Sequence, residues 1–451
     1  MSRLPLTTRG PHEVVAQRGS ARIGVQRFLA EADGLARRLP DRGFAINLCR
    51  DRYRFTRAFA AVLIAGQTNL LPGNRLDATI RDLLADYPDA YILSDEDRDH
   101  HWPACHDARA FEREAAIPAE APQIPADHLA ALVFTSGSTG QAKAIAKPWR
   151  TFHDSTAINA AEMGLAEPPL RHVLATVPGQ HMYGLETSVL MPLFAPVAAS
   201  SAHPFTPADI AATLATLPAP RVLVSSPAHL RALVDPEIEF PPLEAVWSAT
   251  GPLDPAIAAS IEQRHDTRVS EIYGCSEVGS MARREPVRTR VWTPFRGFTL
   301  NMESDDRTRV SAPHLPVDFV LQDVLEHEPD GRFQLVGRTE DLVNVAGKRA
   351  SLVDLNQALL QIPGVEDGVI FDPPERSDGR TSRLAALVVA PELDAPTLRA
   401  ELRKRIDAVF IPRPIRWTRA LPRAETGKLP RQALLDAFAH ALPVRGDPGP
   451  E

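Results

Sequence analysis

Strand-like and helix-like segments alternate through the middle of the chain. Short apolar runs at residues 221–224, 244–247 and 268–273 each predict a buried strand. Helical patterns lie between them, and one begins with Asp254 as the N-cap and Pro255 in the first helical position. This succession predicts an α/β fold in which helices cover largely parallel sheets. Ligands of such sheets bind at the carboxyl ends of the strands.

The pattern changes near residue 339, where a charged run follows a strand-like segment. The expected elements around and beyond this point are strands at 333–336, 368–371 and 384–389 and helices at 352–360 and 396–409. They predict a small α+β domain, joined by a hinge to a larger N-terminal domain. We therefore expect a large domain over residues 1–339 and a small, mobile one over residues 340–451.

Composition narrows the class of protein. The chain has 451 residues, 44% of them hydrophobic and 24% charged, as is usual for a globular protein of two or three domains. Its net charge of −7 disfavours nucleic acid as a partner. The longest apolar stretch, residues 58–66, is too short to span a membrane. Three cysteines cannot form a disulfide framework, so a cytoplasmic location is expected.

One segment carries a strong chemical signal. The apolar run 132–134 opens into four hydroxyl residues and two glycines, and Lys143 follows shortly after. Glycines let a backbone approach a ligand closely, and successive N–H groups can bind an anion. The hydroxyl groups and the ammonium group add donors for phosphate oxygens. The segment therefore predicts a loop that binds a polyphosphate, although a Ser/Gly-rich surface turn is the simpler alternative.

The spacing differs from that of the common GxxxxGK[ST] phosphate loop, because only two residues separate Gly140 from Lys143. The segment instead resembles the phosphate loop of the adenylate-forming superfamily, which includes acyl-CoA synthetases, peptide-synthetase adenylation domains and luciferases. Those loops usually end in Pro-Lys-Gly, where this chain has Ala-Lys-Ala. The resemblance implies that ATP binds through Lys143 and the loop residues Thr135, Ser136, Gly137, Ser138, Thr139 and Gly140.

A second segment, Tyr-Gly-Cys-Ser-Glu at 273–277, follows a predicted strand. It resembles the superfamily's Tyr-Gly-x-Thr-Glu, with serine in place of threonine. The resemblance implies that Tyr273 flanks the adenine, that Gly274 belongs to the nucleotide-binding residues, that Ser276 contacts the α-phosphate, and that Glu277 binds Mg²⁺. Taken alone, a tyrosine at a strand end and a single glutamate are more often structural.

Further matches follow in the superfamily's order. Asp323 aligns with an aspartate that binds the ribose, although Leu-Gln precedes it here in place of Thr-Gly. Arg338 aligns with an arginine near the ribose and phosphates. Glu340 replaces the usual hinge aspartate, and Gly347 would lie beside the thiol channel. An aspartate capping a turn and a charged surface run are the structural alternatives.

The segment Leu-Pro-Arg-Ala-Glu-Thr-Gly-Lys at 421–428 resembles the superfamily's C-terminal lysine loop. The resemblance implies that Lys428 is catalytic. A mobile ammonium group suits the charge that builds at an α-phosphate during attack by a carboxylate. Together, these segments imply a two-step ligase that uses ATP and Mg²⁺. It would form an acyl-adenylate and pass the acyl group to CoA or to an acyl carrier protein in trans.

The acid itself is less clearly indicated. The candidate pocket residues are small or polar, which favours a compact aromatic acid of the hydroxybenzoate type: His181, Ser225, Ser248, Thr250, Gly251, Cys275 and Gly279. A short or medium aliphatic acid is the alternative. A degenerate nucleotide-binding module without activity is a second alternative, suggested by the departures at Ala142, Gln322 and Glu340. A zinc site at His100, His101, Cys105 and His106 fits no standard ligand spacing.

Overall fold

The structure is a computed structural model. It describes residues 2–109, 120–136, 142–234, 237–303, 307–338, 342–345, 348–373, 383–423 and 429–443. By its internal contacts the chain divides into two compact units, Met1–Thr299 with Ser311–Phe319 and Leu300–Val310 with Val320–Glu451. The boundary expected at residue 339 lies within the second unit. It remains a prediction that residues 340–451 move as one domain relative to residues 1–339.

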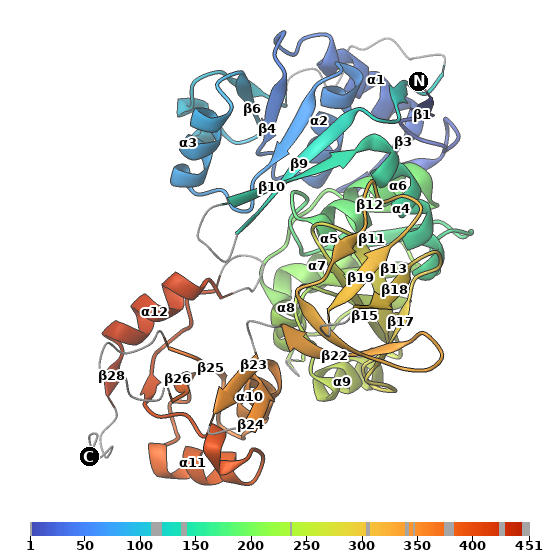
Figure 1. Cartoon of the computed structure of the whole chain (residues 1–451). Helices are drawn as coiled ribbons and strands as arrows, with labels where there is room; N and C mark the ends of the chain where they lie inside the picture. The colour runs from blue at the N-terminus through green and yellow to red at the C-terminus, as the bar shows by residue number, and fades with distance from the viewer. Residues whose placement is uncertain are drawn as a thin grey trace. The chain divides into compact units, whose positions relative to one another are not determined.

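The first unit holds two large sheets (Figure 1). One has the strand order β10-β9-β5-β4-β6-β7, and all neighbours are parallel except the antiparallel pair of β9 and β10. Its strands are β4 (Phe44–Asn47), β5 (Thr68–Leu71), β6 (Ala90–Ser94), β7 (Cys105–Asp107), β9 (Leu129–Ser136) and β10 (Ala142–Pro148). A separate short pair joins β1 (Arg3–Pro5) to β8 (Gln123–Pro125).

Within the first unit, the other sheet has the order β17-β16-β15-β14-β13-β11-β12-β2-β3. Its middle strands, from β15 to β2, are parallel. The strands are β2 (Val14–Arg18), β3 (Ala21–Gly24), β11 (Arg171–Ala175), β12 (Val197–Ser200), β13 (Arg221–Ser225), β14 (Ala245–Ser248), β15 (Arg268–Cys275), β16 (Gly279–Arg284) and β17 (Val291–Pro294). The predicted class of helix-covered, largely parallel sheets is confirmed.

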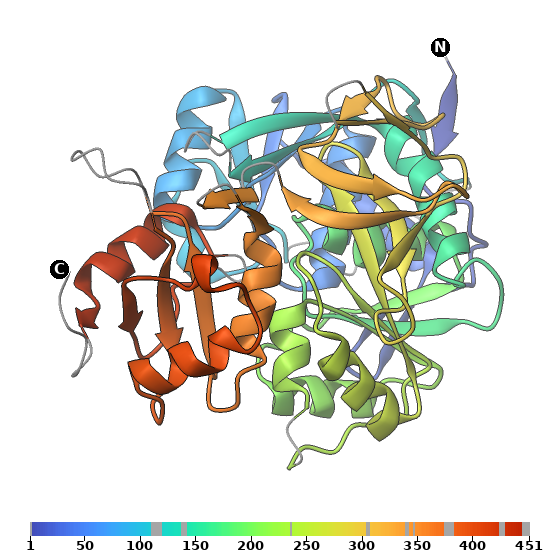
Figure 2. The same cartoon turned by 60° about the horizontal axis from the view of Figure 1, so that its bottom comes forward.

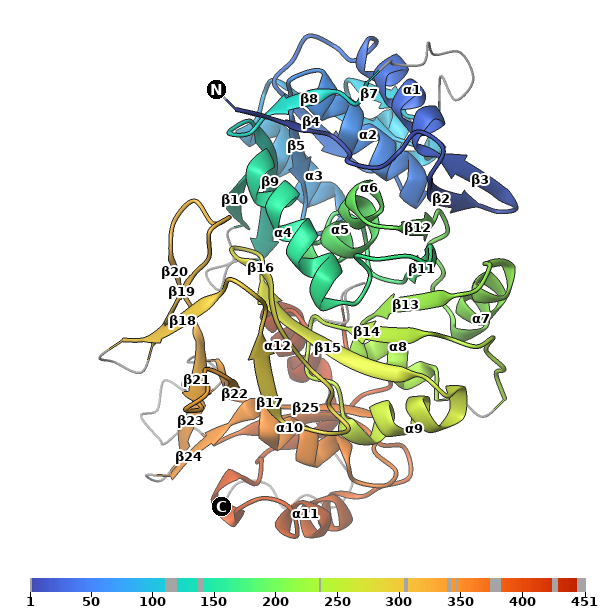
Figure 3. The ribbon, with the colours of Figure 1, turned by 90° about the vertical axis from the view of Figure 1, so that its right-hand side faces the viewer.

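Helices fill the space between these sheets and cover their outer faces (Figure 3). The inner group is α1 (Val25–Ala36), α2 (Arg52–Ile64), α4 (Trp149–Glu162), α5 (Met182–Leu185), a π-helical segment (Glu186–Leu190) and α6 (Met191–Phe194). The outer helices are α3 (Asp77–Asp86) on the first sheet and α7 (Pro207–Thr216), α8 (Pro227–Ala232) and α9 (Pro255–His265) on the second. A 3₁₀ turn spans Asp97–His101. One buried apolar cluster joins the inner helices to both sheets.

The second unit contains a sheet of order β25-β26-β27-β28 with both faces covered (Figure 2). Alternate residues of its central strand β26 (Ala385–Val389) join two different cores, as the two-residue period of a strand requires. The remaining strands are β25 (Asp367–Phe371), β27 (Ile415–Trp417) and β28 (Leu442–Pro443), and the helices are α10 (Leu352–Leu360), α11 (Ala395–Arg403) and α12 (Arg431–His440).

Shorter strands precede this sheet along the chain. A three-stranded sheet consists of β18 (Thr299–Met302), β19 (Thr308–Ser311) and β20 (Phe319–Val320). Two antiparallel hairpins pair β21 (Asp323–His327) with β22 (Phe333–Arg338) and β23 (Leu342–Val345) with β24 (Lys348–Ser351).

Local capping explains where several elements begin and end. The Asp254 side chain accepts a hydrogen bond from the Ala256 N–H, as predicted for the start of α9. The predicted helix over 396–409 is wrong at its end, because α11 stops at Arg403. Beyond it, the Asp407 side chain caps a separate 3₁₀ turn at Ala408–Phe410, so the chain starts a new element there.

Candidate functional site

The predicted phosphate-binding segment begins in β9 and ends in β10. Lys143 lies opposite Thr135 in the antiparallel register, one pair away from the segment that connects the two strands. Its Nζ lies 3.7 Å from the Oε1 atom of Glu277, and the two side chains are 63% and 24% exposed. Residues 137–140 lie outside the described part of the chain, and of Thr135 and Ser136 only the backbone is described. The structure thus brings together two residues predicted from motifs more than 130 positions apart.

The turn between β15 and β16 carries the predicted residues 273–277. Tyr273 is buried and its ring lies 5.6 Å from that of Trp292. Gly274 allows the two strands to approach, because a side chain there would collide with the carbonyl oxygen of Gly279. Gly279 has a φ of +91°, a conformation that favours glycine. Both glycines are therefore needed to form this turn.

Two buried charges that the sequence analysis missed adjoin the same turn. Lys147 on β10 is only 2% exposed and donates a 2.6 Å hydrogen bond to the carbonyl oxygen of Glu277. Glu186, 1% exposed, accepts hydrogen bonds from the Oγ of Ser280 at 2.6 Å and from its N–H at 3.1 Å. Lys147 is four positions after Lys143, so both lie on one face of the strand. The available signal was a lysine that directly follows the apolar residues 144–146.

Burial perturbs both charges. Burial raises the pKa of the Glu186 carboxyl, and the hydrogen bonds from Ser280 and the Lys147 ammonium partly offset this rise. It lowers the pKa of the Lys147 ammonium, against the attraction of Glu186, Cys275 and Glu277. The pair is therefore desolvated, and each charge depends on the other.

The predicted acid-binding residues lie partly at the carboxyl ends of parallel strands. Ser225 ends β13 and lies opposite Ser248, which ends β14. The Oγ of Ser225 is 2.9 Å from the Oγ1 of Thr176. The Oγ of Ser248 is fully buried and has no hydrogen-bond partner among the described residues. Thr250, two positions on, has a φ of +80°, which is strained for a β-branched residue.

The other predicted acid-binding residues have different environments. His181 is half-buried directly before α5, Cys275 is half-buried, and Gly251 is exposed. Tyr183, in the segment after His181, is buried, and its hydroxyl has no hydrogen-bond partner in the described part of the chain. Such a buried hydroxyl is costly unless a partner arrives.

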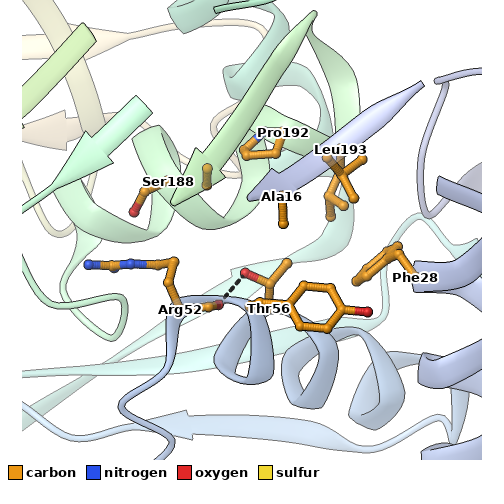
Figure 4. Close-up of a pocket in the computed structure, with 10 residues that line it drawn as sticks. Ala16, Phe28, Arg52, Thr56, Ser188, Pro192 and Leu193 are labelled. Carbon is orange, nitrogen blue, oxygen red and sulfur yellow. Dashed lines mark hydrogen bonds between the residues drawn. The ribbon is translucent and has the colours of Figure 1, made fainter. Parts of the chain in front are cut away.

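A small pocket in the first unit contains none of the predicted site residues (Figure 4). Its walls are mainly apolar and come from β2, α1, α2 and the helical region around Ser188. Arg52 borders it, and its guanidinium donates hydrogen bonds to the carbonyl oxygens of Val177 and Ala175. Arg52 also lies close to Gly179, so it supports the backbone of the segment that leads to His181. No motif in the sequence marks this role.

In the second unit, Asp323 begins β21 and lies opposite Arg338, the last residue of β22. The two predicted nucleotide-binding residues are thus cross-strand neighbours, although the Arg338 side chain is not described. Glu340, Gly347 and Lys428 lie outside the described residues.

The described residues contain neither a cluster suited to a metal ion nor a membrane-spanning helix. No group of three or more His, Cys, Asp or Glu side chains in that part is placed to hold a metal ion, so the zinc hypothesis has no support there. None of the helices described here is both long enough and apolar enough to cross a bilayer.

Comparison with known proteins identifies similar sequences and folds. Residues 41–321 match the family described as AMP-binding enzyme. A 4-coumarate–CoA ligase of Rhodobacter capsulatus is 31% identical over 299 residues, which cover 65% of this chain and 73% of that protein. The phosphinothricin tripeptide synthetase PhsC of Streptomyces viridochromogenes is 27% identical over 379 residues, 74% of this chain but only 34% of the synthetase.

Among solved structures, the O-succinylbenzoate coenzyme A synthetase of Bacillus subtilis in complex with ATP and a magnesium ion matches with a TM-score of 0.79. The alignment covers 96% of this chain and 100% of that one, at 18% sequence identity. At this identity, the likeness shows a shared fold.

Proposed function

Because this chain belongs to the family of AMP-binding enzymes, we propose that it activates a small carboxylic acid with ATP and passes the acyl group to a thiol. The observation that carries the proposal is the 3.7 Å approach of Lys143 to the Glu277 carboxylate. A phosphate-loop lysine beside a carboxylate suits Mg·ATP, because the lysine attracts phosphate oxygens and the carboxylate attracts a hard cation.

In the first step, a carboxylate oxygen of the acid attacks the α-phosphorus of ATP. The bond from this phosphorus to the bridging oxygen breaks, and pyrophosphate leaves with that oxygen. Lys143 and the 135–140 loop hold the phosphates, Ser276 contacts the α-phosphate, and Lys428 offsets the charge that develops there. Positioning and charge stabilisation supply most of the catalysis in such a displacement.

Glu277 fits the role of a magnesium ligand. Its side chain is 24% exposed and the Lys143 ammonium lies 3.7 Å away, so its oxygens can accept further ligands. Glu277 would hold Mg²⁺, whose charge would stabilise the leaving pyrophosphate. Asp323 and Arg338 would bind the ribose and its neighbouring phosphate. Tyr273 would flank the adenine, and Gly274 would lie beside the nucleotide.

In the second step, a phosphopantetheine thiol attacks the acyl carbonyl carbon, and AMP leaves with the phosphate oxygen. We propose that the segment 340–451 turns about Glu340 between the steps and brings Gly347 beside the thiol channel. The acceptor is CoA or the prosthetic group of an acyl carrier protein. We also infer a cytoplasmic location, because three cysteines are too few for a disulfide framework.

For the acid, we propose an aromatic, hydroxylated compound of the hydroxybenzoate type. The unpartnered hydroxyls of Ser248 and Tyr183, among the described residues, favour a substrate that carries hydrogen-bonding groups of its own. The aromatic substrate named for the relative 4-coumarate–CoA ligase supports the same class. His181, Ser225, Thr250, Gly251, Cys275 and Gly279 complete the proposed pocket. A short or medium aliphatic acid is the alternative substrate.

ATP–pyrophosphate exchange across a panel of carboxylic acids tests this function. We expect exchange that depends on the acid and on Mg²⁺, fastest with hydroxybenzoates. Fastest exchange with aliphatic acids would replace the proposed substrate class. Tight ATP binding without exchange for any acid would instead indicate a non-catalytic nucleotide-binding module. Adding CoA or a loaded carrier protein to the active pair then identifies the acceptor.

A further inference from the structure

The turn between β15 and β16 is held from two sides by buried charges of opposite sign. The Lys147 ammonium donates to the carbonyl oxygen of Glu277, on the β15 side of the turn. The Glu186 carboxylate accepts both the N–H and the hydroxyl of Ser280, on the β16 side. Only two residues lie between the two anchored positions, so the conformation of the whole turn is fixed at both ends.

The anchoring groups come from different elements of the first unit. Lys147 belongs to β10, the strand that also carries Lys143. Glu186 begins the π-helical segment after α5. The carboxylate of Glu186 also lies so close to Gly279 that a side chain there would overlap it. The turn is therefore packed against Glu186 as well as hydrogen-bonded to it.

Neither charge belongs to the nucleotide-binding motifs described above, and both are nearly inaccessible to solvent. Burial of two opposite charges costs more free energy than their attraction supplies unless the geometry is good. A neutral, apolar pair would fill such a space at lower cost. Their presence calls for a role beyond filling the core.

We propose that Lys147 and Glu186 are positioning residues that fix the 275–280 turn so that Ser276 and Glu277 meet Mg·ATP. This inference rests on the proposed function. Lys147 binds the backbone carbonyl of Glu277, whereas Lys143 faces the carboxylate of the same residue. The first lysine therefore holds the position of the backbone, and the second attracts the side chain. A strand that carries both lysines couples the phosphate loop to the magnesium-binding turn.

The test compares Lys147→Met with the double variant Lys147→Met/Glu186→Gln. The single variant loses the hydrogen bond to Glu277 and leaves Glu186 without its compensating charge, so both the thermal midpoint and the affinity for Mg·ATP should fall. We expect the KM for Mg·ATP to rise about tenfold or more, the effect of losing a charge-assisted hydrogen bond, while the KM for the acid stays unchanged. In the double variant the thermal midpoint should recover, because no charge is buried alone, but the KM for Mg·ATP should stay raised.

A purely structural role predicts that the KM for Mg·ATP recovers together with stability in the double variant, and that result would overturn the proposal. Glu31→Gln is the matched control. Glu31 is a buried carboxylate that binds Tyr53 and Arg57 and, among the described residues, does not contact the turn. Its substitution should lower the thermal midpoint without changing the KM for Mg·ATP.

Amide hydrogen exchange of a peptide covering residues 274–281, measured without ligands, separates this inference from the proposed function. We expect faster exchange in Lys147→Met than in the wild type and in Glu31→Gln. Unchanged exchange there would refute the positioning role, even if the enzyme proves to be an active ligase. Conversely, absence of ATP–pyrophosphate exchange in the wild type would refute the proposed function. Amide hydrogen exchange of the peptide would then still show whether Lys147 and Glu186 fix the turn.

Discussion

Gly279 shows how one residue constrains the candidate site. Its φ of +91° and the nearby Glu186 carboxylate both exclude a side chain. We expect Gly279→Ala to cost about 1–3 kcal/mol in backbone strain alone and to slow ATP–pyrophosphate exchange further by displacing Glu186. Gly66→Ala is the control, since Gly66 has a φ of +72° but open space around it. If both variants lose stability and exchange activity equally, the contact with Glu186 is irrelevant to activity.

The sequence identified residues that belong to recognisable motifs. Lys143 and Glu277 were predicted from separate segments, and they lie 3.7 Å apart. Lys147 and Glu186 belong to no motif, and each has an ordinary surface residue type. Only the folded chain shows that they are buried and that they bind the same turn, because β10, the segment after α5 and this turn are far apart in the sequence.

At the scale of elements, local signals predicted helix starts better than helix ends. Asp254 and Pro255 mark the start of α9 because capping depends on neighbouring residues alone. The end of α11 was misplaced because Leu402 is buried whereas the following residues 403–405 are exposed, and tertiary packing decided where the helix stops. The strand order of either sheet could not be predicted, because pairing joins segments far apart in the chain.

Strand β11 contains a buried histidine that makes stability depend on pH. His172 is 3% exposed, and neither ring nitrogen has a hydrogen-bond partner among the described residues. Burial, with Arg22 and Arg221 nearby, lowers its pKa below the usual 6.5. The unfolded chain therefore binds this proton at a higher pH than the folded protein. Protonation of His172 therefore does not reduce the free energy of unfolding above about pH 6.5. As the pH falls from there toward the pKa in the folded protein, the free energy of unfolding decreases by at most about 1.4 kcal/mol per pH unit.

Thermal unfolding of wild type and His172→Leu between pH 7.5 and 5 tests this dependence. The midpoint of the wild type should fall with pH, and that of His172→Leu should fall less steeply. Some slope should remain, because burial also lowers the pKa of His229 and His314. Substitution of the exposed His12 by Gln is the control and should leave the slope unchanged. Parallel curves for wild type and His172→Leu would show that this ring does not contribute.

At the scale of the molecule, the family and the fold class were predictable and are confirmed. Motifs in a fixed order identify a family even when single positions differ, as Ala142 and Ser276 do here. The boundary expected at residue 339 remains a prediction. Contacts place residues 300–310 and 320–338 with the C-terminal unit, whereas the charged run near residue 339 suggested a later division. Contacts group residues that pack together, and a hinge can lie inside such a group.

Substitution of Lys428 tests whether the C-terminal unit takes part in only one of the two proposed steps. If its ammonium offsets charge at the α-phosphate during adenylation alone, Lys428→Ala should slow ATP–pyrophosphate exchange by about a hundredfold, equivalent to roughly 3 kcal/mol. Thioester formation from supplied acyl-adenylate should stay close to the wild-type rate, because that step begins after pyrophosphate has left. Lys404→Ala removes an exposed lysine that pairs with Glu401 in the same unit, and it should change neither rate. Equal losses in both steps for Lys428→Ala would mean that the residue maintains the unit's structure instead of acting in adenylation.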